Sequence, residues 1–176
     1  MPNFAREFAM PNSETFSLAP VSRLLDRWIK PCEIVVDPFS RNSKRATITN
    51  DLNPNTSADF HMLAEEFVET IKVAADAVLF DPPYSPRQIA EVYQQIGRHC
   101  GKEDTQNSRL YKRVKDGLDK ILKPRGIAIC CGWSSMGFGL KRGYELLEVL
   151  LVPHGGAHND TIVTVERKIS NAGLFD

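Results

Sequence analysis

Ala77-Val78-Leu79-Phe80-Asp81-Pro82-Pro83-Tyr84-Ser85 contains an uninterrupted apolar run that ends in an acid and two prolines. Such a run predicts a strand buried on both faces, as in a parallel sheet. Because proline has a fixed φ and no N–H, Pro82 and Pro83 cannot continue the strand. We therefore expect the strand to end at Asp81, with a rigid loop at its carboxyl end, where open α/β sheets bind ligands.

The residues after this strand suit the chemistry of an exocyclic amine on a nucleobase. The Asp81 carboxylate and the backbone carbonyl of Pro82 can accept both amine hydrogens and direct the nitrogen lone pair toward an electrophile. Pro83 helps to hold these acceptors rigid. Tyr84 can stack on a base that has left its duplex. The alternative is a plain Pro-Pro turn in which Asp81 caps a neighbouring backbone group.

Asp81-Pro82-Pro83-Tyr84 resembles the catalytic motif of S-adenosylmethionine-dependent amino-methyltransferases, above all the adenine-N6 DNA methyltransferases. The resemblance covers residues 16–168, and the chain is similar to small stand-alone members of phages and mobile elements. It implies a Rossmann-like class I methyltransferase fold and S-adenosyl-L-methionine as cofactor. It also implies methyl transfer to N6 of adenine in DNA with low sequence specificity. The implied catalytic residues are Asp81, Pro82, Pro83 and Tyr84.

Other functions remain open at this stage. The same acceptors would serve adenine in RNA or the N4 amine of cytosine in DNA. A methyltransferase-like module that binds nucleic acid or a partner without catalysis is a further alternative. The sequence does not separate DNA from RNA.

The resemblance also implies a site for the methionine end of the cofactor. Phe16, Ser17 and Pro20 lead into a helix predicted from apolar residues at 21, 24, 25 and 28, with Ser17 as its N-cap. They resemble the family segment that touches this end of the cofactor. A second apolar strand, 33–36, runs into Asp37-Pro38-Phe39-Ser40, which resembles the family's Asp-Pro-Phe and its glycine-rich turn.

This chain has Ser40-Arg41-Asn42-Ser43 where the family has glycine. Serine and asparagine can still adopt tight and left-handed turns. A third strand-like run, 46–51, ends in Asp51, and an acid in that place binds ribose hydroxyls in nucleotide-binding sheets. The cofactor-binding residues implied by these comparisons are Phe16, Ser17, Pro20, Asp37, Pro38, Phe39, Ser40, Asn42, Asp51, Ala64 and Asp81.

The adenine of the cofactor is expected beside a fourth predicted strand, 59–64, which precedes a short helix over 65–71. The family often has an acid or amide near Leu63 that accepts from the adenine amine. Since leucine cannot do so, we expect the backbone of Ala64 and apolar walls to hold the adenine instead.

The rest of the chain predicts a doubly wound, mostly parallel α/β sheet. Helices are expected after Ser85, with apolar residues at 89, 92, 93 and 96, and over 110–122, with a polar loop at 97–108 between them. The basic outer face of the second helix is either solvated or phosphate-binding. After a strand at 127–131 and a loop at 132–139, the runs 144–152 and 161–167 are too close for a crossover helix, which predicts a terminal antiparallel hairpin.

Composition favours a single globular domain. The 176 residues include 22 Lys and Arg against 22 Asp and Glu, so contact with nucleic acid requires a local basic patch. We expect residues 1–15 to form a flexible arm and 16–176 a catalytic domain without a separate target-recognition domain. The cysteines indicate reduced thiols in a cytoplasmic protein. His154 and His158 lie in a glycine-containing loop, and neither a metal site nor a membrane segment is expected.

Overall fold

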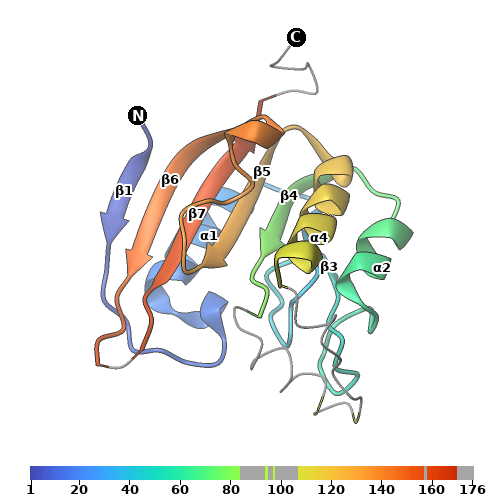
Figure 1. Cartoon of the computed structure of the whole chain (residues 1–176), viewed down its shortest axis with the longest axis horizontal. Coiled ribbons are helices and arrows are strands. Elements are labelled where there is room, and N and C mark those ends of the chain that lie inside the picture. The colour runs from blue at the N-terminus through green and yellow to red at the C-terminus, as the bar shows by residue number, and fades with distance from the viewer. Residues whose placement is uncertain (84–93, 95–96, 98–106, 157, 170–176) are drawn as a thin grey trace.

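The computed structural model describes residues 1–83, 94, 97, 107–156 and 158–169. Within these residues, the strands form one sheet in the order β1-β6-β7-β5-β4-β2-β3 (Figure 1). The strands are β1 (Asn3–Arg6), β2 (Val35–Asp37), β3 (Ile48–Thr49), β4 (Ala75–Phe80), β5 (Leu122–Gly132), β6 (Tyr144–Val152) and β7 (Thr161–Lys168). Tyr84, Cys100, the helix predicted after Ser85 and nearly all of the loop predicted over 97–108 lie outside the described residues.

The sheet is parallel except at β7, which is antiparallel to both β5 and β6. The predicted mostly parallel sheet and its C-terminal hairpin are therefore confirmed. β4 lies between β2 and β5 and pairs with both in parallel, from Val35↔Ala77 to Phe80↔Cys130. The carboxyl ends of β2, β3 and β4 consequently meet at one edge of the sheet.

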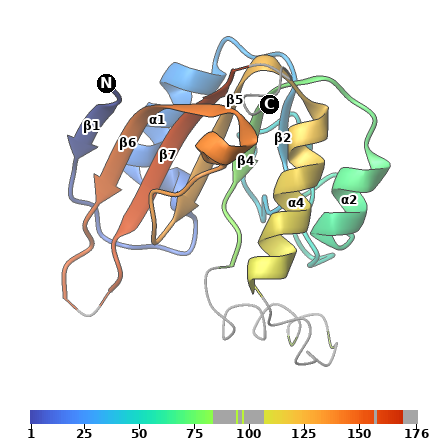
Figure 2. The ribbon, with the colours of Figure 1, turned by 45° about the horizontal axis from the view of Figure 1, so that its top comes forward.

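Helices cover both faces of this sheet (Figure 2). Helix α1 (Ala19–Ile29) packs on one face, whereas α2 (Ala64–Thr70) and α4 (Asn107–Ile121) pack on the other. Side chains of β4 alternate between the two cores: Leu79 packs on the α1 side, whereas Val78 and Phe80 pack on the side of α2 and α4. β4 is therefore buried on both faces, as its unbroken apolar run predicted.

Helix α1 follows the predicted apolar period, since Val21, Leu24 and Leu25 are all buried. Its start differs from the prediction. Ser17 belongs to a 3₁₀ turn, η1 (Thr15–Ser17), and its hydroxyl donates to the carbonyl of Glu14 rather than capping α1. Leu18 takes the cap position, and Pro20, in the first turn, has no N–H that needs a partner.

The N-terminal arm expected to be flexible instead contains β1, which pairs in parallel with residues 148–151 of β6. The pairing continues beyond β1, where Glu7 N donates to Leu151 O and Ala9 N donates to Pro153 O. Backbone groups make these contacts, and a pairing at a sheet edge needs no apolar alternation in the sequence. Because residues 1–15 are polar and aperiodic, their sequence did not predict this strand.

The strand predicted over 59–64 is also wrong, because only an isolated bridge between Asn50 and Phe60 forms there. The side chain of Asp59 explains the difference. Its carboxylate accepts hydrogen bonds from both the backbone N and the hydroxyl of Thr49, at 2.9 and 2.6 Å. Phe60 adds two backbone hydrogen bonds, from its N to Thr49 O and from Asp51 N to its O. Side-chain and backbone contacts together thus hold this segment against β3 without a strand, and α2 begins directly afterwards, at Ala64.

The contact between α2 and α4 depends on the absence of a side chain at Gly117. A Cβ built there would lie 2.3 Å from Cγ2 of Val68, which is far inside van der Waals contact. Gly117→Ala should therefore lower the free energy of unfolding by about 1 kcal/mol or more, although alanine is the better helix former by about 1 kcal/mol. Urea denaturation measures the change.

A matched double variant checks this packing explanation. Val68→Ala removes Cγ2, the atom nearest to the new Cβ, and leaves Val68 Cβ 2.7 Å away. Gly117→Ala should therefore cost less in that background than in the wild type, although some of the cost remains. A gain in stability from Gly117→Ala alone would contradict the close packing of the two helices.

Candidate active site

A cavity of about 690 Å³ opens at the edge where β2, β3 and β4 end. Its walls come from residues 11–16, 38–43, 50–53, 62–65 and 81–83, together with single residues including Trp133 and His154. The cavity thus lies outside the carboxyl ends of parallel strands, where an open α/β sheet binds its ligand.

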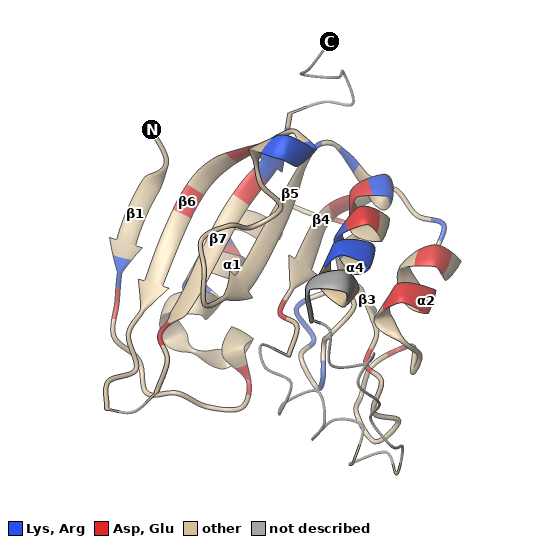
Figure 3. Cartoon of the chain, viewed as in Figure 1, with Lys and Arg blue, Asp and Glu red and all other residues tan. Residues whose placement is uncertain are grey.

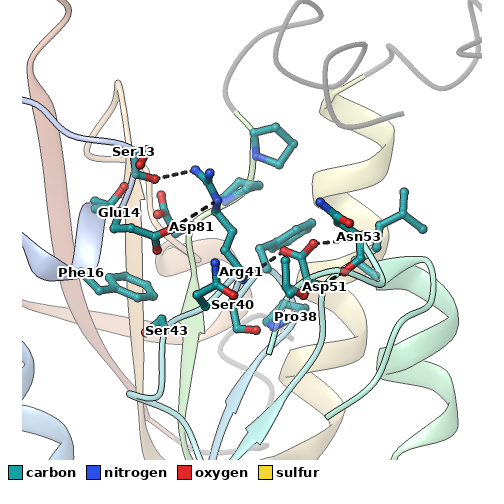
Figure 4. Close-up of a pocket in the computed structure, with 18 of the residues that line it drawn as sticks. Ser13, Glu14, Phe16, Pro38, Ser40, Arg41, Ser43, Asp51, Asn53 and Asp81 are labelled. Atoms are coloured by element: carbon teal, nitrogen blue, oxygen red, sulfur yellow. Dashed lines mark hydrogen bonds and ion pairs between the residues drawn. The ribbon is translucent and has the colours of Figure 1, made fainter. Parts of the chain in front are cut away.

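The structure brings most of the predicted cofactor-binding residues together around this cavity (Figure 4). Those that line it are Phe16, Pro38, Phe39, Ser40, Asn42, Asp51, Ala64 and Asp81. Three others do not. Ser17 lies in η1, Pro20 is buried in the α1 core, and Asp37 is buried beneath the cavity wall.

The turn after β2 is closed without glycine, and Arg41 adopts its left-handed conformation, with φ of 51°. The sequence suggested serine or asparagine for this role. Two carboxylates hold the turn: Phe39 N donates to Asp37 Oδ1 at 2.9 Å and Arg41 N donates to Asp51 Oδ2 at 3.0 Å. Ser40 adds hydrogen bonds from its N and Oγ to the carbonyl of Asn50. These contacts offset the cost of a left-handed non-glycine residue.

Asp51 fixes the end of β3 relative to this turn. Besides the bond from Arg41, it accepts a hydrogen bond from Asn53 N on Oδ1 at 2.9 Å. Each carboxylate oxygen retains a second acceptor site. Asp51 lines the cavity and can therefore still accept hydrogen bonds from a ligand.

Asp37 is fully buried at the end of β2, and among the described residues its Oδ2 has no hydrogen-bond partner. Burial raises the pKa of this carboxyl to about 8, and repulsion from the carboxylates of Asp81 and Asp51 adds to the rise. The hydrogen bond from Phe39 N opposes it. At neutral pH Asp37 is therefore mostly protonated, which limits the negative charge beside Asp81.

This raised pKa predicts a pH dependence of stability. Asp37 ionises near 3.8 in the unfolded chain and near 8 in the folded one, so between these values the folded state binds the extra proton. The free energy of unfolding should then fall as pH rises, by about 1.4 kcal/mol per pH unit from this group, and level off above pH 8. Asp37→Asn should flatten the slope between pH 5 and 8.

Urea denaturation at several pH values measures this slope, with the exposed Asp26→Asn as the matched control. The control should keep the wild-type slope. An equal slope in Asp37→Asn and the wild type would show that Asp37 is not the group that titrates.

A second cavity, of about 240 Å³, lies beside the first. Pro82 and Trp133 line both cavities, so the two meet at the loop after β4. The smaller cavity is also bordered by Phe80 and Tyr111 and by residues 130–134, 136 and 137. Its aromatic walls and its position suit a flat, partly apolar group.

Tyr111 of α4 fixes the loop after β4. Its hydroxyl donates to the carbonyl of Pro83, and its ring packs edge-on against Phe80 with 5.8 Å between centroids. Burial, with a further contribution from the Asp81 carboxylate, raises the pKa of Tyr111, which keeps the hydroxyl protonated as a donor. The sequence analysis did not identify Tyr111, because an aromatic residue at helical spacing looks like ordinary core.

Lys115 was predicted on the outer face of α4, but it points inward. Its ammonium lies 4.9 Å from the ring centroid of Phe80 and donates to the carbonyl of Gly137. Glu166 of β7 holds the same loop by accepting from Phe138 N and Gly139 N, and burial raises its pKa. The polar alternation Thr164, Glu166, Lys168 along β7 was the available signal for this buried polar face.

The two histidines near the larger cavity have different surroundings. The ring nitrogens of His154 contact Ala9 O at 2.7 Å and Thr161 Oγ1 at 2.8 Å, which ties the hairpin to the N-terminal segment. His158 is exposed. Across the described part of the chain, His, Cys, Asp and Glu form no cluster that could hold a metal ion, and no helix is long and apolar enough to cross a membrane.

No protein-family model matches the chain, and no curated protein matches it in sequence. Solved structures do match its fold. TrmN from Thermus thermophilus aligns with a TM-score of 0.57 and 17% identity, over 86% of this chain and 49% of that one. NSun6 from Pyrococcus horikoshii, solved with SFG, aligns with a TM-score of 0.59 and 14% identity, over 85% and 51%. An rRNA methylase from Streptococcus thermophilus aligns with a TM-score of 0.53 and 10% identity, over 92% and 100%.

The chain thus spans about half the length of the first two proteins and all of the third. At these identities the similarity concerns the fold. The sheet order and the single antiparallel strand β7 agree with the fold of these aligned proteins. The chain has the Rossmann-like class I methyltransferase fold.

Proposed function

We propose that this protein transfers a methyl group from S-adenosylmethionine to the N6 amine of adenine in DNA. The observation that carries the proposal is the position of the loop after β4. Asp81 lines the larger cavity, and the next residue, Pro82, lines both cavities. A methyl donor in one cavity and an amine in the other would therefore meet at this loop.

The larger cavity suits the cofactor in size and charge. Its volume of about 690 Å³ lies within the range of small-molecule sites. The carboxylates of Asp51, Glu65 and Asp81 in its walls favour a ligand with a sulfonium and an ammonium group. In this placement Asp51 accepts from the ribose hydroxyls, while Met62 and Ala64 border the adenine.

The smaller cavity would hold the target base. Phe80, Tyr111 and Trp133 offer apolar and aromatic contact to a base that has left its stack. The Asp81 carboxylate and the Pro82 carbonyl would accept both hydrogens of the amine and stabilise the positive charge that grows on the nitrogen during in-line attack. As the N–C bond formed, the bond from sulfur to the methyl group would break and S-adenosylhomocysteine would leave. The methylated nitrogen would then lose one proton to water. This mechanism needs no separate general base before methyl transfer. Tyr84, proposed to stack on the base, lies outside the described residues.

The start of α4 offers cations for the phosphate backbone. Leu110 and Tyr111 line the two cavities, and the next residues, Lys112 and Arg113, are exposed. Figure 3 shows Lys and Arg interspersed with acidic residues on α4, whereas the charged residues of α2 beside it are acidic. Exposed cations within one turn of the site support a nucleic-acid substrate. RNA is the second candidate, because a protein of similar fold is an rRNA methylase.

Asp81→Ala should abolish methyl transfer while leaving cofactor binding nearly intact. Removing one preorganised polar contact to a developing charge typically lowers turnover by about 100- to 1,000-fold. The wild type and the variant are incubated with S-adenosylmethionine and duplex DNA, single-stranded DNA or RNA. The nucleic acids are then digested, and methylated nucleosides are identified and quantified by mass spectrometry. S-Adenosylhomocysteine affinity should stay within about threefold, since Asp81 acts on the amine and this ligand lacks the sulfonium charge that the Asp81 carboxylate favours.

Asp26→Ala, which removes an exposed acid of α1, serves as the matched control and should keep wild-type turnover. N6-Methyladenine in DNA from the wild type supports the proposal. Methylated RNA without methylated DNA would instead support the second candidate, an RNA methyltransferase. Wild-type turnover in Asp81→Ala would contradict the role of the loop, and absence of both product and cofactor binding would contradict the proposed function.

A further inference from the structure

We infer that Arg41 binds the carboxylate at the methionine end of the cofactor, and that Glu14 competes with this carboxylate for Arg41. The inference rests on the proposed function, because it assigns one contact within the proposed cofactor site. It concerns the position at which the turn after β2 has arginine where the resembling family has glycine.

The backbone of Arg41 is fixed at the cavity wall. Its N–H donates to Asp51 Oδ2 at 3.0 Å, and its φ of 51° is set by the turn between β2 and β3. The side chain then extends toward the N-terminal segment, where the guanidinium donates to Ser13 O and lies 3.7 Å from Glu14 Oε1 (Figure 4). The flexible side chain of Arg41 therefore extends from the turn after β2, where its backbone is fixed, to the opposite wall at Ser13 and Glu14.

The charges around the cavity favour Arg41 as the partner of a bound carboxylate. Among the described lining residues, Glu14, Asp51, Glu65 and Asp81 are acidic, whereas Arg41 is the one lysine or arginine. An α-amino acid group has both an ammonium and a carboxylate. The acids other than Glu14 suit the ammonium, and the planar guanidinium suits the carboxylate, which it can bind through two parallel N–H donors.

The present partner of Arg41 is easily exchanged. The side chains of Arg41 and Glu14 are 54% and 35% exposed, and the separation of 3.7 Å is too long for a hydrogen bond. Exposed pairs of this kind contribute little to stability. Glu14 also lies two residues from Phe16, which lines the same cavity and was predicted to touch the methionine end. A ligand carboxylate placed there would meet Arg41 directly.

Arg41→Gly tests the inference without straining the turn, because glycine adopts a φ of 51° readily. Calorimetry compares two ligands with the full chain: S-adenosylhomocysteine, and 5′-methylthioadenosine, which has the nucleoside and thioether but no amino-acid group. Arg41→Gly should weaken S-adenosylhomocysteine binding by about 10- to 100-fold. The affinity for 5′-methylthioadenosine should change by less than about twofold, since that ligand lacks the carboxylate.

Two further variants sharpen the test. Glu14→Gln removes the competing anion and should tighten S-adenosylhomocysteine binding by about two- to fivefold in the wild type, with no gain in Arg41→Gly. Arg45→Ala is the matched control, since Arg45 follows the same turn but pairs with Asp26 outside the cavity walls. Its S-adenosylhomocysteine affinity should equal that of the wild type.

The outcomes separate this inference from the proposed function. If the wild type binds both ligands but Arg41→Gly weakens them equally, or weakens neither, the inference is overturned and the cofactor site stands. If Arg41→Gly weakened nucleic-acid binding but left the S-adenosylhomocysteine affinity unchanged, the inference would likewise be overturned, because Arg41 would then contact the nucleic acid. If the wild type binds neither ligand, both the proposed function and the inference fail.

Discussion

The burial of β4 between β2 and β5 is the constraint on which the rest of the structure depends. Both faces of β4 are covered by apolar side chains, from α1 on one side and from α2 and α4 on the other. After the half-buried Asp76 at its start, β4 is apolar up to Phe80. The next polar group is Asp81, directly after the strand, where two prolines prevent the strand from continuing. The parallel strands β2 and β3 place Asp37 and Asp51 at the same edge of the sheet as Asp81, so the strand order brings three acids together there.

Three acids at one edge would repel one another if all were ionised. Burial resolves part of this conflict, because it raises the pKa of Asp37 and keeps that group protonated at neutral pH. Asp51 is compensated by backbone N–H donors from Arg41 and Asn53. The turn after β2 thus uses carboxylates for the work that glycine does in the resembling family, and the guanidinium of Arg41 supplies a positive charge inside an otherwise acidic wall.

Long apolar runs and short connections were sufficient to predict β4, the hairpin and the fold class, because burial on two faces leaves a strong signal. Features that depend on single long-range contacts were not predictable. β1 pairs through backbone groups and packs only the small side chain of Ala5 on the core. The segment at Asp59 is held by the Asp59 carboxylate across to Thr49 and by a single bridge at Phe60. Tyr111 acquires its role only when α4 lies beside the loop after β4.

A crystal structure of the complex with S-adenosylhomocysteine tests the central claim most directly. The account predicts the ligand in the cavity at the carboxyl ends of β2, β3 and β4, with its ribose at Asp51 and its sulfur facing Asp81 beside Pro82. The smaller cavity would then remain open on the other side of that loop. Ligand bound elsewhere on the chain, or in this cavity with its sulfur turned away from Asp81, would contradict the account.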